Sequence, residues 1–306
     1  MAPKIIFGTA SFGMDLTEFQ DVESVRALLS TLRDLNISHL DSGARYPPLN
    51  PGRAEQLIGE AKELSSHFLA DTKVFTDTRN DGSGDLTRSA VASSANDSLD
   101  RLRRAEGTPL EEHIQGSNEQ IAQGHWVSNT SPETLEQILR LCEQNGWVKP
   151  LCYQGEYSLI SRGMETRLLP ILRAHGMTFN AFRGLASGFL TGNFVNDRKS
   201  GTRFGDENPL GKAVQRIFGA EDLTRATKIF DAEVRAHGLS PVEVAAHWLS
   251  HHSELTEEDG LVLGASKRSQ IIETVSLIQK GPLPAAVLDL TDNLWTVLKE
   301  TRGNII

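Results

Sequence analysis

Hydrophobic residues along this chain follow two recurring patterns. One is a short, continuous apolar run, which is typical of a buried strand, and the other is an apolar residue at every third or fourth position, which is typical of an amphipathic helix. The runs predict strands that begin near Ile5, Ile37, Phe68, Trp126, Trp147, Thr178 and Leu261. Helical spacing follows the first strand at Val22, Val25, Leu29 and Leu32. Strands that alternate with helices predict a parallel sheet with crossover helices.

Two folds have this alternation, the (β/α)8 barrel and the doubly wound sheet. No Gly-x-Gly-x-x-Gly separates the first strand from the first helix, which weighs against a doubly wound dinucleotide-binding domain. The length of 306 residues fits one barrel, and no change in composition divides the chain. We therefore predict an α/β fold of the TIM type, formed by a single domain over residues 1–306.

One strand of the barrel is missing from the pattern. A TIM-type barrel closes with eight strands, and the apolar runs supply only seven. After Leu102, where the fourth strand is due, residues 103–110 contain no apolar run, and a helix is predicted from Pro109. The barrel is therefore predicted to be incomplete, either with an irregular link at residues 103–107 or with neighbouring strands closed over the gap. Because a gap exposes unpaired strand edges, we expect lower stability than a complete barrel would have.

Local signals mark other boundaries. Ser131 before Pro132, and Ser240 further along, are good helix N-caps. Residues 86–102 are helical by their period, and residues 187–222 form a connection too long for a simple link, which indicates a functional loop. The face of the 86–102 helix that we predict to be buried consists of Val91, Ala95, Leu99 and Leu102.

The charge balance excludes some classes of partner. The chain has 31 Lys and Arg against 40 Asp and Glu, a net charge of -9, and no basic run, so nucleic acid and anionic membranes are poor partners. No apolar stretch approaches the ~18 residues that span a bilayer. The two cysteines, Cys142 and Cys152, give no disulfide or metal framework and suit a reducing compartment. We expect a soluble cytoplasmic protein, and the sequence leaves its oligomeric state open.

Three side chains with acid–base chemistry stand at the ends of predicted strands. Asp41 and Tyr46 follow the second strand, and Lys73 belongs to the third. A free tyrosine has a pKa near ~10, and a neighbouring ammonium stabilises its phenolate. Lys73 would therefore make Tyr46 a stronger general acid, while Asp41 holds the lysine. Taken singly, each residue also fits a role without chemistry: Asp41 as a turn residue, Tyr46 as a loop aromatic and Lys73 as a solvated charge.

The order of three motifs resembles the aldo-keto reductases, in particular the branch that includes the aflatoxin-aldehyde reductases. The motifs are Gly8-Thr9-Ala10-Ser11-Phe12-Gly13, Leu40-Asp41-Ser42-Gly43-Ala44-Arg45-Tyr46 and Thr72-Lys73-Val74. The resemblance implies that Asp41, Tyr46 and Lys73 are three of four catalytic residues. The fourth is a histidine at the end of the strand that this pattern lacks. His113 and His125 lie near the gap, but chance placement explains them better, and none of the nine histidines has the spacing of a metal site.

The same resemblance implies an NADP(H) cofactor. Ser128, Asn129 and Gln154 match contacts to the nicotinamide carboxamide, and Phe182 stands where a tyrosine usually stacks on the nicotinamide ring. The stretch that starts at Arg183 resembles the loop around the pyrophosphate, where small residues let backbone N–H groups approach the anion. Its candidate contacts are Arg183, Leu185, Ala186, Ser187, Gly188, Leu190 and Gly192.

The adenosine end of the cofactor is matched near the last strand. Ser266, Lys267 and Arg268 lie between a strand and a helix, where N–H groups and two cations could bind a 2′-phosphate, which favours NADP over NAD. The remaining cofactor candidates are Asp41, Arg203, Gln270, Glu273 and Thr274, and the substrate candidates are Tyr46 and Arg216. Arg203 and Arg216 would alternatively be solvated loop charges.

The resulting functional prediction is NADPH-dependent reduction of an aldehyde or ketone to an alcohol, with a small carbonyl compound as the partner. The branch that the chain resembles suggests a fungal secondary-metabolite pathway. The missing histidine leaves three interpretations open. The gap is a segment lost from the gene model, or the chain is an NADP-binding regulatory module with impaired catalysis, or it is a biosynthetic enzyme that uses the tyrosine for non-redox proton transfer.

Overall fold

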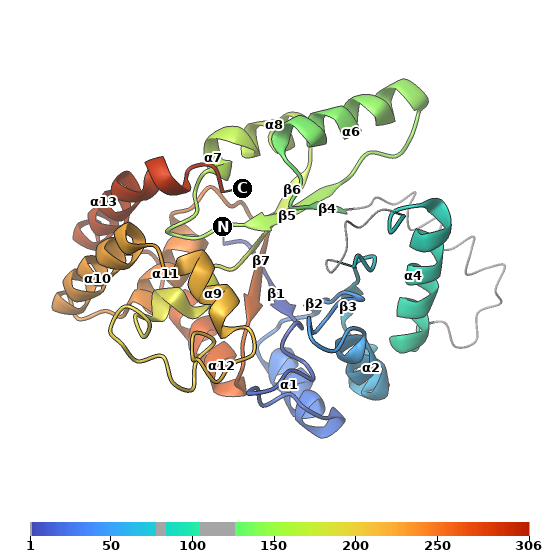
Figure 1. Cartoon of the computed structure of the whole chain (residues 1–306), viewed down its shortest axis with the longest axis horizontal. Coiled ribbons are helices and arrows are strands. Elements are labelled where there is room, and N and C mark those ends of the chain that lie inside the picture. Colours follow the sequence, from blue (N-terminus) through green and yellow to red (C-terminus); the bar gives the residue numbers. More distant parts are fainter. Residues whose placement is uncertain (1, 78–83, 105–125, 306) are drawn as a thin grey trace. The chain divides into compact units, whose positions relative to one another are not determined.

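The computed structural model of the chain describes residues 2–77, 84–104 and 126–305 (Figure 1). Contacts between residues divide the chain into two units. Unit 1 consists of Met1–Lys4, Glu119–Leu261 and Thr274–Ile306, and unit 2 consists of Ile5–Asn118 and Val262–Glu273. Each unit has its own helices, strands and buried core. In the described ranges, no helix has the length and apolar character needed to cross a bilayer.

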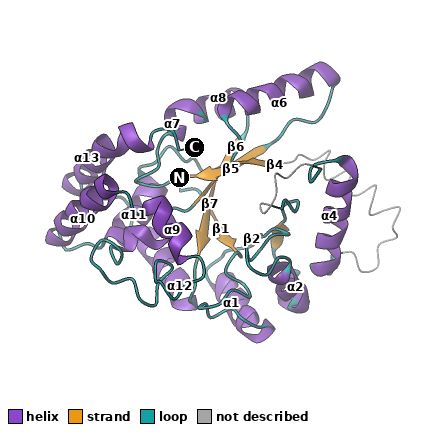
Figure 2. Cartoon of the chain, in the orientation of Figure 1, coloured by secondary structure: helices purple, strands orange, loops and turns teal. Residues whose placement is uncertain are grey.

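Unit 2 is built on three neighbouring strands, β1 (Lys4–Gly8), β2 (His39–Asp41) and β3 (Leu69–Asp71), which pair in parallel. Figure 2 shows these strands in orange and the helices that connect them in purple. The helices are α1 (Val22–Asp34), α2 (Arg53–Glu60), α3 (Lys62–Ser65) and α4 (Arg88–Arg101). Buried rings of Phe7, Phe12 and Phe19 pack together beside β1, with ring centres 5.7–6.5 Å apart.

Unit 1 contains β4 (Trp126–Ser128), β5 (Cys152–Glu156) and β6 (Thr178–Phe182), again parallel. Its helices are α6 (Pro132–Asn145), α7 (Met164–Arg167), α8 (Leu169–Ala174), η1 (Ala186–Thr191), α9 (Gly211–Phe218), α10 (Glu221–Ala236), α11 (Pro241–His251) and α13 (Ala285–Arg302). The core includes Tyr153, Tyr157, Phe179 and Trp248, which are all buried.

The strand β7 (Gly260–Gly264) runs from one unit into the other and leads into α12 (Arg268–Ile278). The order of paired strands is β4-β5-β6-β7 in unit 1 and β3-β2-β1-β7 in unit 2. The described residues thus form seven strands at the seven predicted places, and the α/β class with an incomplete barrel is confirmed. That the whole chain acts as a single domain stays a prediction.

The region of the missing strand lies largely outside the described residues. This holds for residues 105–125, which include the predicted helix start at Pro109 and the histidines His113 and His125. The last described residue before it, Arg104, donates hydrogen bonds from Nη2 to the carbonyl oxygens of Ser65 (2.9 Å) and Phe68 (3.2 Å). The end of α4 is therefore tied to the start of β3.

The predicted buried face of α4 was only partly right. Leu102, just after the helix, is buried, but within α4 the buried residues are Ser94 and Ser98. Ser94 Oγ accepts a hydrogen bond from the backbone N–H of Phe75 (2.8 Å), and Ser98 Oγ accepts one from Arg101 (3.1 Å). Small hydroxyl groups face inward because this face of the helix meets polar groups. The spacing of apolar residues in the sequence does not reveal such a polar contact.

Other boundaries differ in detail. The strand predicted from Trp147 begins only at Cys152, because Pro150 has no N–H to donate and Trp147 is 62% exposed. The segment 187–222 is not a simple loop, since it contains most of η1 and all of α9. Ser131 and Ser240 do cap their helices, accepting hydrogen bonds from the backbone N–H groups of Thr134 and Glu243, each at 3.2 Å.

Candidate active site

In unit 2, an ion pair joins the residues at the carboxyl ends of β2 and β3. Lys73 Nζ lies 2.5 Å from Asp41 Oδ1 and donates a second hydrogen bond to the carbonyl oxygen of Ser42 at 2.7 Å. The same Nζ lies 4.9 Å from the centre of the Tyr46 ring. Asp41 is 4% exposed, so solvent screens this pair little. The structure therefore brings together the three residues that the sequence predicts to be catalytic.

The surroundings keep Lys73 charged. Burial alone lowers the pKa of a lysine, but the negative charge of Asp41 and the interaction with Tyr46 outweigh burial, so the pKa of Lys73 is raised. Lys73 is consequently an ammonium at neutral pH. An ammonium beside a phenol stabilises the phenolate that a proton transfer would leave.

Backbone hydrogen bonds fix the loop that carries Tyr46. The N–H of Ser42 donates to the carbonyl oxygen of Asp71 (3.1 Å), and that of Ala44 donates to the carbonyl oxygen of Lys73 (3.1 Å). A Cβ added at Gly43 would lie 3.3 Å from the Cβ of Lys73, so glycine gives the lysine room to cross the loop. The parallel pairing of β2 and β3 thus continues into the site.

A second polar pair, which sequence reasoning missed, lies on the same strands. His39 Nε2 is 2.5 Å from Asp71 Oδ2, and Asp71 pairs with Asp41 in the register of β2 and β3. Burial raises the pKa of Asp71, and the hydrogen bond from His39 offsets only part of that rise. The sequence could have indicated this pair, because residues 39 and 41 of one strand point to the same face, so His39 is expected on the same side of the sheet as Asp41.

The residues predicted to bind a 2′-phosphate lie at the start of α12. The N–H groups of Ser266 and Lys267 donate to Gln270 Oε1, at 2.9 and 3.1 Å. The N–H of Arg268 donates to Glu18 Oε2 at 2.9 Å, a contact that sequence reasoning missed. A carboxylate therefore already stands at this helix N-terminus, while the side chains of Lys267 and Arg268 are exposed.

In unit 1, the predicted carboxamide contacts lie on neighbouring strands. Ser128 of β4 is in register with Gln154 of β5, and Gln154 is in register with Asn180 of β6. Gln154 and Asn180 are buried, whereas Ser128 and Asn129 are exposed. The structure thus places two polar side chains, one of them missed, next to each other in an apolar core.

The end of β6 carries Phe182 and Arg183. The Arg183 guanidinium lies 5.6 Å from the centre of the Phe182 ring, and its Nη1 donates to Glu156 Oε2 at 2.8 Å. A Cβ at Gly184 would lie 2.5 Å from Leu249 Cδ1, so a larger residue there would require the Leu249 side chain of α11 to shift. Glu156, at the end of β5, was not among the predicted site residues.

The predicted pyrophosphate loop has an unusual backbone. Positive φ angles occur at Arg183 (58°), Ala186 (49°), Ser187 (59°), Gly188 (92°) and Gly192 (77°). Runs of right- and left-handed residues form concave backbone surfaces that suit anions. The buried side chain of Leu190 anchors the loop in the core, and the side chain of Leu185 is half-buried. The φ of Gly192 lies in the left-handed region that favours glycine, and an added Cβ would lie 2.3 Å from Asp231 Oδ1.

The two predicted arginines that follow this loop in the sequence, Arg203 and Arg216, differ in their surroundings. Desolvation of the guanidinium and, to a smaller extent, the positive charge of Arg183 lower the pKa of Arg203, although the residue keeps an exposed surface. Arg216 is exposed on α9, where its Nε donates to the carbonyl oxygen of Lys212 at 3.4 Å.

The last two candidates lie further along α12. Glu273 is exposed and its neighbour Thr274 is buried, so their side chains point to different faces of the helix.

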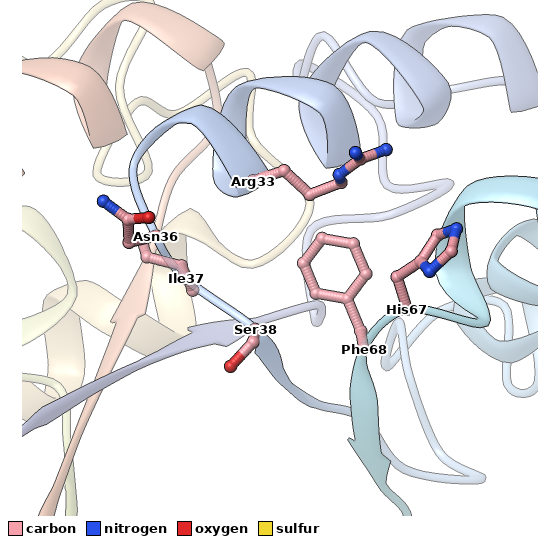
Figure 3. Close-up of a pocket in the computed structure, with 6 residues that line it drawn as sticks. All are labelled: Arg33, Asn36, Ile37, Ser38, His67 and Phe68. Carbon is pink, nitrogen blue, oxygen red and sulfur yellow. The ribbon is translucent and has the colours of Figure 1, made fainter.

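Figure 3 shows a hollow in unit 2, formed by side chains near the starts of β2 and β3. Its volume is about 420 Å³. The side chains that line it are Arg33, Asn36, Ile37, Ser38, His67 and Phe68. These residues precede β2 and β3, whereas ligands of parallel α/β sheets bind at the carboxyl ends of the strands. This hollow is therefore not the predicted site.

Comparison with known proteins places this arrangement in a class. The family model described as the aldo/keto reductase family matches residues 4–108 and 124–296. The chain therefore belongs to the aldo/keto reductase family, whose fold is a TIM barrel. The match stops between residues 108 and 124, close to the place where the apolar pattern loses a strand.

Individual relatives narrow the position within the family. Oxidoreductase sirO of Leptosphaeria maculans is 31% identical, over 98% of this chain and 95% of its own length. Aflatoxin B1 aldehyde reductase member 2 is 29% identical in Rattus norvegicus, over 99% of this chain and 88% of that protein. The human protein of the same name is 28% identical, over 98% of this chain and 88% of its own length. The resemblance to the aflatoxin-aldehyde-reductase branch is confirmed.

Proposed function

We propose that this protein reduces an aldehyde or ketone to an alcohol with NADPH. The observation that carries the proposal is the contact of Lys73 Nζ with both Asp41 Oδ1 (2.5 Å) and the ring of Tyr46 (4.9 Å). A phenol, an ammonium and a buried carboxylate in this order can deliver one proton and stabilise the charge left behind. Family membership supports carbonyl reduction as the reaction.

Each of the three residues has a distinct role in the proposal. Tyr46 donates its Oη proton to the oxygen of the carbonyl as negative charge develops there. Lys73 stabilises the resulting phenolate, and Asp41 fixes the position of Lys73. NADPH, when bound, supplies the two electrons and the hydrogen that reduce the carbonyl carbon.

The residues of unit 1 fit a nicotinamide dinucleotide. The buried amide of Gln154 suits the carboxamide, and the exposed part of Phe182 offers a flat apolar surface for a ring. The cation of Arg183 and the left-handed backbone at residues 186–188 suit a diphosphate, and Arg203 adds a second positive charge. The fit rests on donor types and charges that match the parts of the cofactor.

The preference for NADP is the finer part of the proposal. It is supported by the exposed cations Lys267 and Arg268 at the start of α12. Glu18 opposes it, because its carboxylate accepts the Arg268 N–H and would have to give way to a phosphate. We therefore expect a smaller advantage of NADPH over NADH than two cations alone would give.

We further propose that the natural carbonyl compound belongs to fungal secondary metabolism. The support is that relatives with significant identity occur in fungi, among them oxidoreductase sirO of Leptosphaeria maculans and aldo-keto reductase pigE of Monascus ruber. If the fourth catalytic residue of the family is indeed missing, the carbonyl is oriented less firmly and turnover is slow.

The test is to mix purified protein with NADPH and a series of aliphatic and aromatic aldehydes, and to follow both cofactor binding and cofactor oxidation. We expect binding, and oxidation that depends on the aldehyde. Binding without any aldehyde-dependent oxidation would contradict the reductase proposal and favour the regulatory interpretation. Absence of NADPH and NADH binding would contradict both.

A further inference from the structure

A buried carboxylate in unit 1 has no part in the chemistry described so far. Glu156 is the last residue of β5, where it pairs in register with Phe182 of β6, and it is 6% exposed. A buried charge is costly unless cations and hydrogen bonds compensate it. The groups that compensate Glu156 therefore indicate what it does.

One oxygen of Glu156 is held by a rigid, buried anchor. Oε1 accepts a hydrogen bond from Ser161 Oγ (2.8 Å) and lies 3.7 Å from Arg302 Nη2. Arg302 is 6% exposed and is itself fixed, since it donates to the carbonyl oxygen of Ile160 (2.5 Å) and to Ser161 Oγ (3.0 Å). The carboxylate thus has little freedom to move.

The other oxygen of Glu156 holds a side chain that reaches the surface. Oε2 accepts a hydrogen bond from Arg183 Nη1 at 2.8 Å, and the side chain of Arg183 is 40% exposed. The guanidinium also lies 5.6 Å from the centre of the Phe182 ring. An arginine has five N–H donors in one plane, so this contact leaves donors for a ligand. Glu156 therefore connects a fixed interior to an orientable cation.

A second cation lies close to Arg183. Arg203 is near enough that the two positive charges disfavour each other. The next residue, Phe204, is buried against Phe189 and Phe218, with ring centres 5.9 and 6.0 Å apart, which fixes the backbone beside Arg203. A ligand with at least two negative charges can interact with both cations.

We propose that Glu156 is a positioning residue for the dinucleotide diphosphate, which it serves by fixing the orientation of the Arg183 guanidinium. The inference rests on the proposed function, because the diphosphate belongs to the cofactor. Glu156 does not touch the ligand. Its contribution passes through Arg183, so it must vanish when Arg183 is replaced.

A double-mutant cycle tests this dependence. NADPH affinity is measured by fluorescence titration for wild type, Glu156→Gln, Arg183→Leu and the double variant. We expect Glu156→Gln to raise the Kd about tenfold, because the guanidinium loses its fixed orientation. Arg183→Leu should raise the Kd at least as much, and the double variant should bind no worse than Arg183→Leu alone. A purely structural role of Glu156 would instead weaken binding equally in both backgrounds.

A matched control is Glu165→Gln. Glu165 is also a partly buried carboxylate of unit 1, but it pairs with a different arginine, Arg162, at 2.8 Å, and accepts a hydrogen bond from Tyr157 Oη at 2.7 Å. Its replacement should leave the Kd for NADPH within about twofold of wild type.

Several results would overturn the inference. They are an unchanged Kd for folded Glu156→Gln, additive losses in the double variant, or, should Glu156→Gln fail to fold, an unchanged Kd for Arg183→Leu. If wild type binds no NADPH at all, both the proposed function and this inference are contradicted. If wild type binds NADPH but the losses in the double variant are additive, only this inference is contradicted.

Discussion

At the scale of single residues, the chemistry depends on how each side chain is charged. Lys73 remains an ammonium because Asp41 and Tyr46 outweigh the effect of burial and raise its pKa. The sequence predicted this group because motifs along the chain bring its members to adjacent strand ends. It could not predict Glu156 or Glu18, since a lone acidic residue has no periodicity and its partners are distant in sequence.

Replacing Lys73 tests the role of the ammonium. We expect Lys73→Met to lower kcat by roughly 10²-fold or more, because the phenolate of Tyr46 loses its stabilising charge. The Kd for NADPH should change little. Steady-state kinetics and a binding titration measure the two effects, and Lys228→Met, an exposed change on α10, serves as the control. Equal losses in kcat and in NADPH affinity would contradict this role.

At the scale of elements, the period of hydrophobic residues predicted where helices and strands lie but not always which face is buried. The strands β1 and β6 follow directly from their apolar runs, whereas α4 buries Ser94 and Ser98. The reason is a polar cluster around Glu55 of α2, which is fully buried. Arg101 Nε donates to Glu55 Oε2 at 2.7 Å, so α4 is attached to α2 by an ion pair instead of an apolar stripe.

Removing the charge of Glu55 should detach α4. We expect Glu55→Gln to lower the free energy of unfolding by about 2–4 kcal/mol, because the Arg101 guanidinium loses its buried partner. Glu60→Gln on the same helix removes a more exposed pair with Arg53 and should cost less than about 1 kcal/mol. Urea unfolding of both variants gives the comparison, and similar losses would show that the buried pair does not hold α4.

At the scale of the whole molecule, alternating periodicity was sufficient to predict the α/β class and seven strands. It could not predict the division of contacts into two units, because that depends on which distant residues meet. The break in the family match between residues 108 and 124 agrees with the break in the apolar pattern. Both observations concern the same stretch of sequence, which lies largely outside the described residues.

Unfolding of the molecule should depend on pH through His247. This residue of α11 is 6% exposed, and burial lowers its pKa. The negative charge of Glu243 opposes this effect, whereas the positive charges of His251 and Lys280 add to it. A histidine whose pKa is lower in the folded state stabilises the fold above its unfolded pKa of ~6.5. That contribution is lost as the pH falls from ~6.5 through the folded pKa, at up to ~1.4 kcal/mol per pH unit.

Urea unfolding of wild type and His247→Gln at several pH values measures this effect. The variant should lose less stability between neutral and mildly acidic pH. His237→Gln, an exposed change at the end of α10, should follow the wild-type profile. Parallel profiles for wild type and His247→Gln would contradict the assignment.

The most direct measurement compares wild type with Tyr46→Phe, which removes one hydroxyl and keeps the ring beside Lys73. NADPH affinity and aldehyde-dependent NADPH oxidation are determined for both proteins. The proposed mechanism predicts that Tyr46→Phe binds NADPH with nearly the wild-type Kd and loses at least ~10²-fold in kcat. Oxidation of NADPH by the variant at the wild-type rate would contradict the assignment of Tyr46 as the proton donor.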